Sequence, residues 1–312
     1  MSTVVVPKRL VEVCLVNVAS HVPQLFVDDC EREYRERLQR AAARIRQSGA
    51  HIIMLTGPSA SGKTTSSHML AKALRETGVP AKVISLDNFF LGSENYPILP
   101  DGSKDYESPA TLDMPKINQC LADLYTTGRT DLPVYDFVHE RRADHTEHIE
   151  LEGGVCIVEG IHALNPELTR ILPAGGVYRI YAGLREEYSS DGVRCISTRD
   201  IRLCRRLLRD AMARGHSPEK TLEMWSRVLD GENKYIKLYK NTADLILDTS
   251  FTYELGVIAG LVRQAGPLIR PDCKAAPLWT ETVKRFAELE PLPVDCVPAD
   301  SMLREFYGDL QK

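Results

Sequence analysis

The sequence lacks the features that mark several classes of protein. None of its eight cysteines stands in a C-x-x-C pair, so we expect neither a zinc site nor a redox motif of that spacing. No apolar run approaches the roughly 18 residues of a membrane span. Lys8, Arg9 and Glu12 interrupt the apolar N-terminal stretch, so no signal peptide is expected. These features favour a cytoplasmic protein without a membrane partner.

An excess of positive charge is also missing. The formal net charge is -4 over 312 residues, whereas a protein that binds nucleic acid usually carries a basic surface. No internal repeat or low-complexity segment is present either. We therefore expect a globular protein that has no nucleic-acid partner.

Apolar runs alternate with stretches of helical spacing along much of the chain. This alternation predicts an α/β fold, with a mostly parallel sheet that is covered by helices on both faces. The predicted strands are residues 51–57, 81–87, 154–160, 177–183 and 243–249, and the predicted helices are residues 29–46, 63–78, 112–128 and most of 199–230.

Three regions are expected along the chain. Residues 1–50 form an N-terminal extension with an amphipathic helix, which either packs on its own domain or serves as an interface. Residues 51–265 form the α/β domain, in which residues 92–110 are an ordered functional loop and about 199–230 a helical lid. Residues 266–312, rich in proline, form a small helical appendage.

A glycine-rich loop stands between the first predicted strand of the α/β domain and the next helix. Residues 55–67, LTGPSASGKTTSS, place Gly57, Gly62, Lys63 and Thr64 in the order G-x-x-x-x-G-K-T. Glycines let backbone N–H groups turn towards a phosphate chain, and the helix N-terminus adds its positive end. Lys63 is expected to reach the β- and γ-phosphates, and the Thr64 hydroxyl to hold Mg²⁺. Further donors to the nucleotide are Ser59, Ser61 and Thr65.

Two acidic residues follow predicted strands. Asp87, in VISLDNFF, stands at the carboxyl end of its strand, where ligands of open α/β sheets bind. It can take the proton of an attacking hydroxyl and lie beside the metal. Glu159, in GVCIVEG, follows a continuous apolar run and can bind the metal directly or through water. The alternatives are a turn aspartate and an ordinary strand end.

Four arginines share one face of the predicted lid helix. Arg202, Arg205, Arg206 and Arg209 stand at i, i+3, i+4 and i+7, a spacing that brings side chains together. On a lid they would close on the phosphates, with Arg205 binding the nucleotide and the next two stabilising the transferred phosphoryl group. The alternative is a solvated basic face.

The motifs together resemble those of the uridine kinase and phosphoribulokinase group of P-loop kinases. The segments on which this resemblance rests are GPSASGKTT, SLDNFF, DYESPATLD, LPVYDF, VEGIHALN and RLCRRLLRDAMARG, in that order. VPADSMLREFYG and the region after the lid are similar to a bacterial branch of uridine-kinase-like proteins. In that branch a threonyl-tRNA-synthetase-like region often precedes the kinase, and we expect that region to be missing here.

The resemblance implies a P-loop NTPase fold of the nucleoside-kinase type. It also implies that Asp87 is the catalytic base, that Glu159 supports Mg²⁺ with Thr64, and that Arg206 and Arg209 contact the phosphates from the lid. The group often forms dimers or tetramers, so a homo-oligomer is possible.

The resemblance also suggests an acceptor site. Glu107, in DYESPATLD, stands where uridine kinases carry an aspartate that binds the ribose hydroxyls, and Tyr135 stands where they carry an aromatic residue beside the base. Loop capping and core packing are the alternatives. Two positions depart from the pattern, because a histidine comes one place early and the lid ends Arg-Gly-His rather than Arg-Gly-Arg. The residues concerned, with their basic neighbour, are His139, Arg141, Arg214 and His216.

The sequence thus predicts a kinase that uses ATP and Mg²⁺ to phosphorylate a hydroxyl, most plausibly the 5'-hydroxyl of uridine or cytidine. The same chemistry on another nucleoside, a sugar phosphate or a polyol is the first alternative. A nucleotide-binding regulator without catalysis is the second.

Overall fold

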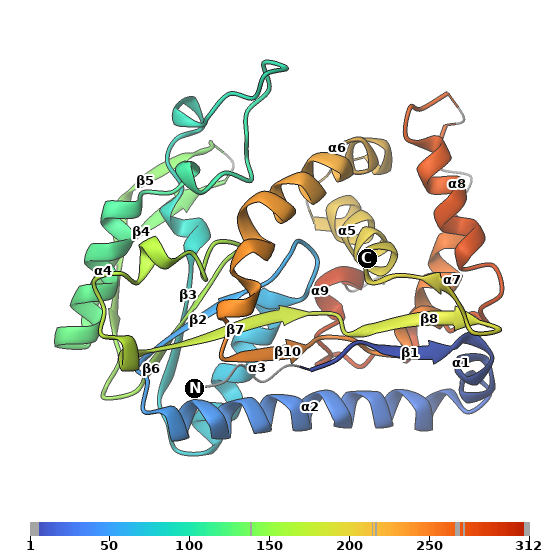
Figure 1. Cartoon of the computed structure of the whole chain (residues 1–312), viewed down its shortest axis with the longest axis horizontal. Coiled ribbons are helices and arrows are strands. Elements are labelled where there is room, and N and C mark those ends of the chain that lie inside the picture. The colour runs from blue at the N-terminus through green and yellow to red at the C-terminus, as the bar shows by residue number, and fades with distance from the viewer. Residues whose placement is uncertain are drawn as a thin grey trace.

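A five-stranded parallel sheet forms the centre of the molecule (Figure 1). The computed structural model describes residues 6–137, 139–213, 215, 217–265, 269–270 and 272–308. The strand order is β10-β7-β2-β6-β3, and every neighbouring pair is parallel. The strands are β2 (Ile52–Thr56), β3 (Ala81–Ser85), β6 (Val155–Glu159), β7 (Val177–Gly183) and β10 (Leu245–Asp248).

Both faces of this sheet are covered, as the apolar runs predicted. Along β2, Ile53 and Leu55 belong to one core cluster, whereas Ile52 and Met54 belong to the other, because successive side chains of a strand point to opposite faces. The first cluster includes residues of α2 (Pro23–Ser48) and α3 (Lys63–Glu76), and the second includes residues of α4 (Met114–Thr127). The predicted α/β fold class is confirmed.

The N-terminal region is built into the domain. After α1 (Val13–Ser20), α2 begins at Pro23, six residues before the predicted start, and ends at Ser48, where it is followed by Gly49 with a left-handed φ of 68°. Its buried residues Tyr34, Leu38 and Ile45 belong to the core. The apolar stripe of this helix therefore packs on its own domain.

Two smaller sheets were not predicted. β4 (Arg129–Asp136) and β5 (Arg141–Glu150) form an antiparallel hairpin, which lies with α4 at the opposite end of the molecule from α8 (Figure 1). β1 (Arg9–Glu12) pairs in parallel with β8 (Glu186–Ser190), which also pairs antiparallel with β9 (Val193–Ile196). β5 is mostly exposed, half of β1 and of β9 is exposed, and β4 and β8 carry charged residues among buried ones, so no continuous apolar run marks these strands.

The region predicted as a lid consists of α5 (Thr198–Ala213) and α6 (Pro218–Gly231), followed by a π-helical turn over Glu232–Ile236 and a 3-10 turn over Lys237–Thr242. The remaining helices are α7 (Glu254–Ala265), α8 (Ala276–Arg285) and α9 (Arg304–Tyr307). Phe306 and Tyr307 are fully buried in the main core, so the end of the described chain is anchored there. In the described part of the chain, no helix combines the length and apolar character that crossing a membrane requires.

Candidate active site

The glycine-rich loop connects β2 to α3 at the carboxyl edge of the sheet. Gly62 has a φ of 81°, a left-handed conformation that favours glycine. A Cβ on Gly57 would collide with the carbonyl oxygen of Ala182 and the hydroxyl of Ser61. The Ser61 Oγ is buried and has no hydrogen-bond partner, which leaves a donor that a phosphate oxygen could satisfy. The loop therefore fits a phosphate chain.

Glu159, at the end of β6, lies directly beside this loop. Its side chain is only 3% exposed. One of its oxygens accepts a hydrogen bond from Thr64 Oγ1 at 3.3 Å, and the other accepts one from Ser85 Oγ at 2.9 Å. Burial raises the pKa of Glu159, while the charge of Lys63 lowers it. A hydroxyl and a carboxylate in contact are the oxygen ligands that Mg²⁺ prefers.

Asp87 lies at the same edge of the sheet, in the turn that follows β3. Ser85 and Glu159 are partners in the pairing of β3 with β6, so Asp87 follows Glu159's partner by two residues. The charge of Asp87 contributes to the raised pKa of Glu159, after burial, the main cause. The structure thus brings the proposed base and the proposed metal carboxylate together, within electrostatic reach of Lys63.

Within the described residues, no group of three or more histidine, cysteine or acidic side chains could hold a metal ion. Mg²⁺ is usually held by one or two protein oxygens and otherwise by water and substrate phosphates. The side chains assigned to it from the sequence were Thr64, Glu159 and Asp87.

Two arginines of α5 share the carboxylate of Asp210, and one of them reaches the phosphate loop. Arg206 donates from Nη1 to Ser59 Oγ at 2.7 Å, and its Nε lies 3.3 Å from Asp210. Arg209 donates to the same aspartate, from Nη2 at 3.1 Å and from Nε at 3.2 Å. Asp210 therefore fixes the direction of both guanidinium groups, and Arg206 connects α5 to the loop.

The other two arginines of the stripe have partners inside the protein. Arg202 binds Glu232 with both terminal nitrogens at 2.7 Å. Arg205 is fully buried and binds both oxygens of Glu254 at 2.6 Å. Arg205 also donates to the carbonyl oxygens of Thr249 and Ala60. The structure thus differs from the expected row of four arginines facing phosphate, and Arg205 supports the loop from behind.

The C-terminal segment reaches the start of α3, which the sequence did not suggest. Glu305 accepts hydrogen bonds from the backbone N–H of Thr65 at 3.2 Å and from its hydroxyl at 2.7 Å. Met302 packs where a Cβ of Gly62 would lie. Since Thr65 was expected to bind the nucleotide, a ligand that uses its donors must first displace the Glu305 carboxylate.

The predicted acceptor residues lie in the loop before α4 and on the hairpin, whose strand β4 packs against the turn that contains Asp87. Burial raises the pKa of Glu107, and the charges of Arg206 and Lys63 lower it, so Glu107 lies in electrostatic reach of both. Tyr135, on β4, is 7% exposed, and its ring meets those of Phe90 and Phe137 edge to face at 5.7 and 5.1 Å. Phe90 also meets Tyr96, and Tyr96 meets Tyr106, the residue before Glu107, with ring centres 6.2 and 5.5 Å apart. These rings form an aromatic wall that leads to Glu107, and only one of its members was predicted.

The remaining predicted residues lie at the tip of the hairpin or outside the described residues. His139 binds Asp136 through Nδ1 at 2.6 Å, and its side chain is 64% exposed. Arg141 begins β5 opposite Asp136. Arg214 and His216 lie outside the described residues.

One buried residue near this site was missed. His162, three residues after Glu159, is 3% exposed, and its ring lies 6.3 Å from that of Tyr235. Burial lowers its pKa to about 4, so the ring is neutral at physiological pH. A histidine inside the apolar stretch VEGIHAL was the available signal.

The sequence of this chain also matches known proteins. The model of the phosphoribulokinase/uridine kinase family matches residues 52–255. A uridine kinase of Saccharomyces cerevisiae is 30% identical over 201 residues, which are 63% of this chain and 36% of that protein. A uridine kinase of Lactobacillus johnsonii is 29% identical over 197 residues, which are 63% of this chain and 85% of that protein.

The chain thus matches about a third of the length of the yeast relative and most of the bacterial one. The family match covers well over half of this chain, and it includes the glycine-rich loop, Asp87, Glu159 and the arginines of α5. The chain belongs to the phosphoribulokinase/uridine kinase family.

Proposed function

We propose that this protein is a kinase that transfers the γ-phosphoryl group of ATP, with Mg²⁺, to the 5'-hydroxyl of uridine or cytidine. The observation that carries the proposal is the meeting of Lys63, the Thr64–Glu159 pair and Asp87 at one edge of the sheet. A phosphate loop alone would serve many reactions, but a carboxylate near the transferred phosphate is suited to activating a hydroxyl.

Each group has a chemical task in this reaction. The loop N–H groups and Lys63 hold the phosphates, and Asp87 accepts the proton of the attacking hydroxyl. Arg206 and Arg209, directed by Asp210, stabilise the charge that spreads over the transferred group. Thr64 and Glu159 would hold Mg²⁺, which when bound neutralises charge on the phosphate oxygens.

The acceptor is proposed from the relatives and from the wall beside Glu107. The Glu107 carboxylate can accept hydrogen bonds from two neighbouring hydroxyls, and the Tyr135 ring offers an apolar surface to a base. The position of His139 differs from the pattern in uridine kinases, which supports a second candidate. In that case the same transfer is made to another nucleoside, a sugar phosphate or a polyol.

The test is an ADP-release assay with ATP and Mg²⁺ against nucleosides, pentose phosphates and polyols. The Lys63→Ala variant, purified in parallel, controls for contaminating kinases. Turnover with uridine or cytidine supports the first candidate, and turnover only with another acceptor supports the second. If ATP binds tightly but no acceptor gives turnover, the kinase proposal fails and a nucleotide-binding regulator takes its place.

A further inference from the structure

A basic cavity lies next to the phosphate loop, on the side of β7. It has a volume of about 340 Å³ and is lined by Pro58 of the loop, by the end of β7 at Gly183, and by residues of β8, α5 and the 3-10 turn after the π-helical turn. Seven lysine and arginine side chains line it, against two carboxylates. Its walls therefore carry an excess of five positive charges.

The two carboxylates already have cationic partners. Glu187 binds Lys8 at 2.5 Å and Arg194 at 3.1 Å. Glu232 binds Arg202 at 2.7 Å and Lys237 at 2.8 Å. Four of the seven cations are thus paired with these two carboxylates.

The other three cations of the cavity are Arg185, Arg199 and Lys240. Among the described residues, no carboxylate lies within ion-pair distance of any of these three. A bound anion would supply the negative partner that these three side chains lack.

Arg185 is the most informative of these. It is 8% exposed, and its Nε is buried without a hydrogen-bond partner. Its backbone N–H is held by Asp248 Oδ1 at 3.1 Å and Ser250 Oγ at 2.7 Å, so the residue is fixed at the end of the sheet. A buried cationic donor without a partner is unfavourable, and a bound anion would remove that cost.

Lys240 also lines this cavity. Its ammonium group stands 5.4 Å from the centre of the Tyr181 ring. Burial lowers the pKa of Lys240, and the charges of Arg185, Lys8 and Lys237 lower it further. The cations of this cavity thus repel one another in the absence of an anion.

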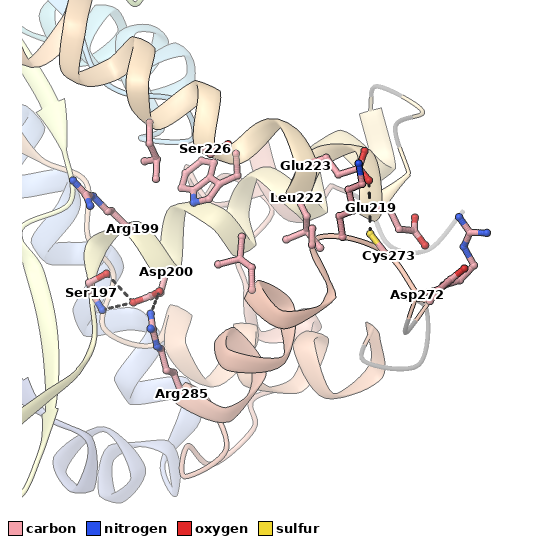
Figure 2. A pocket seen from close by; sticks show the side chains of 16 residues that line it. Ser197, Arg199, Asp200, Glu219, Leu222, Glu223, Ser226, Asp272, Cys273 and Arg285 are labelled. Carbon is pink, nitrogen blue, oxygen red and sulfur yellow. Dashed lines mark hydrogen bonds and ion pairs between the residues drawn. The ribbon is translucent and has the colours of Figure 1, made fainter. Parts of the chain in front are cut away.

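This imbalance is not a general feature of the surface. A larger neighbouring cavity of about 930 Å³ lies between α5, α6 and α8 (Figure 2). Four basic and four acidic side chains line it, and Figure 2 shows the pair of Asp200 with Arg285 inside it. The two cavities share Ser197 and Arg199, yet only the smaller has an excess of one sign.

We propose that the cavity around Arg185, Lys240 and Pro58 is a second binding site, adjacent to the phosphate loop and distinct from the site at Lys63, for a small molecule that carries a phosphate or diphosphate group. Its volume suits a small ligand. A guanidinium group can bind two phosphate oxygens through two parallel hydrogen bonds.

The wall of this cavity is also connected, through its residue Glu232, to the proposed acceptor site. Glu232 is the first residue of the π-helical turn, and such turns are frequent at functional sites. The preceding residue, Gly231, lies against the side chain of Glu107. An anion that draws Arg202 or Lys237 away from Glu232 would therefore act on a segment that contacts the proposed acceptor site.

The test measures binding of pyrophosphate by calorimetry to the full-length Lys63→Ala protein, in which the phosphate loop is weakened. We expect one remaining site, with affinity reduced at least tenfold by Arg185→Gln or Lys240→Gln. Lys240 is only partly buried, so its variant is expected to fold even if the buried Arg185 proves structural. Lys72→Gln, on the exposed face of α3, is the matched control and should bind as the parent does.

Competition with inorganic phosphate, a sugar phosphate and a nucleoside triphosphate then identifies the source of the phosphate group. The proposal predicts that at least one of them displaces pyrophosphate, and that this displacement also depends on Lys240. Equal binding of sulfate, or equal loss of binding in Lys72→Gln and Lys240→Gln, would show non-specific attraction of anions and would overturn it.

Discussion

The phosphate side and the acceptor side of the proposed active site are built in different ways. Thr64 and Glu159 lie at the ends of core elements, and the buried Glu159 carboxylate accepts hydrogen bonds from Thr64 and Ser85. Tyr135 and His139 come from a hairpin whose second strand is exposed along most of its length. The core thus fixes the phosphate chemistry, whereas an added surface element shapes the acceptor side and can change at little cost to the fold.

The largest expected effect is on the phosphate side. We expect Asp87→Asn to lower kcat by roughly 10²–10⁴-fold, because it removes the proton acceptor, and to leave ATP affinity nearly unchanged. Steady-state kinetics and nucleotide titration would measure the two quantities separately. A variant that keeps its kcat would show that the carboxylate is not the base.

The second effect concerns the support behind the phosphate loop. Arg205→Ala leaves the buried Glu254 without its cation, which costs about 3–5 kcal/mol of unfolding free energy. Denaturant unfolding measures this loss. Arg209→Ala, also on α5 but less deeply buried, is the control, and equal losses in the two variants would contradict the division of the stripe into supporting and phosphate-facing arginines.

The third effect is a pH dependence of stability. Burial lowers the pKa of His162 to about 4, against an ordinary value of about 6.5. As pH falls from about 6.5 to 4, only the unfolded state takes up this proton, so the folded state loses about 3 kcal/mol. Unfolding free energies across this range should fall less steeply for His162→Leu than for the parent, and identical slopes would refute the assignment.

The fourth effect belongs to the acceptor side. Glu107→Gln should raise the KM for the acceptor roughly 10–100-fold, because neutral hydrogen bonds to the acceptor replace stronger charged ones. The KM for ATP should change little. Kinetics with each substrate varied in turn give the two values. An effect confined to ATP would move Glu107 to the phosphate side.

The smallest effect is expected at the tip of the hairpin. His139→Ala should leave stability within about 0.5 kcal/mol, because its pair with Asp136 is exposed, and should change the ratio of kcat/KM for uridine and cytidine by a few-fold. His148, which binds Asp131 at 2.7 Å on the same hairpin, is a matched control. If His148→Ala changes the ratio equally, the tip of the hairpin does not discriminate between the two bases.

Much of the phosphate side could be predicted from the sequence. Strands buried on both faces, such as β2 and β6, are continuous apolar runs, and the loop after β2 follows a fixed spacing. The division of the arginines could not be predicted, because Glu232 and Glu254, the partners of Arg202 and Arg205, lie 30 and 49 residues away along the chain. The contact of Glu305 with Thr65 spans 240 residues, and local patterns carry no information on such pairs.

The acceptor side was harder to predict from the sequence, for a related reason. β5 is charged and exposed, so no alternation of apolar and polar residues marks it. The aromatic wall around Tyr135 is assembled from loop and hairpin residues that only the fold brings together.

The central claim is that the assembled phosphate side transfers a phosphoryl group to a nucleoside hydroxyl. The most direct measurement is ³¹P NMR of a reaction of the full-length protein with ATP, Mg²⁺ and uridine. The account predicts that ADP and a 5'-phosphomonoester of uridine form in equal amounts, and that neither forms with Lys63→Ala. ADP and inorganic phosphate without any phosphomonoester would contradict it.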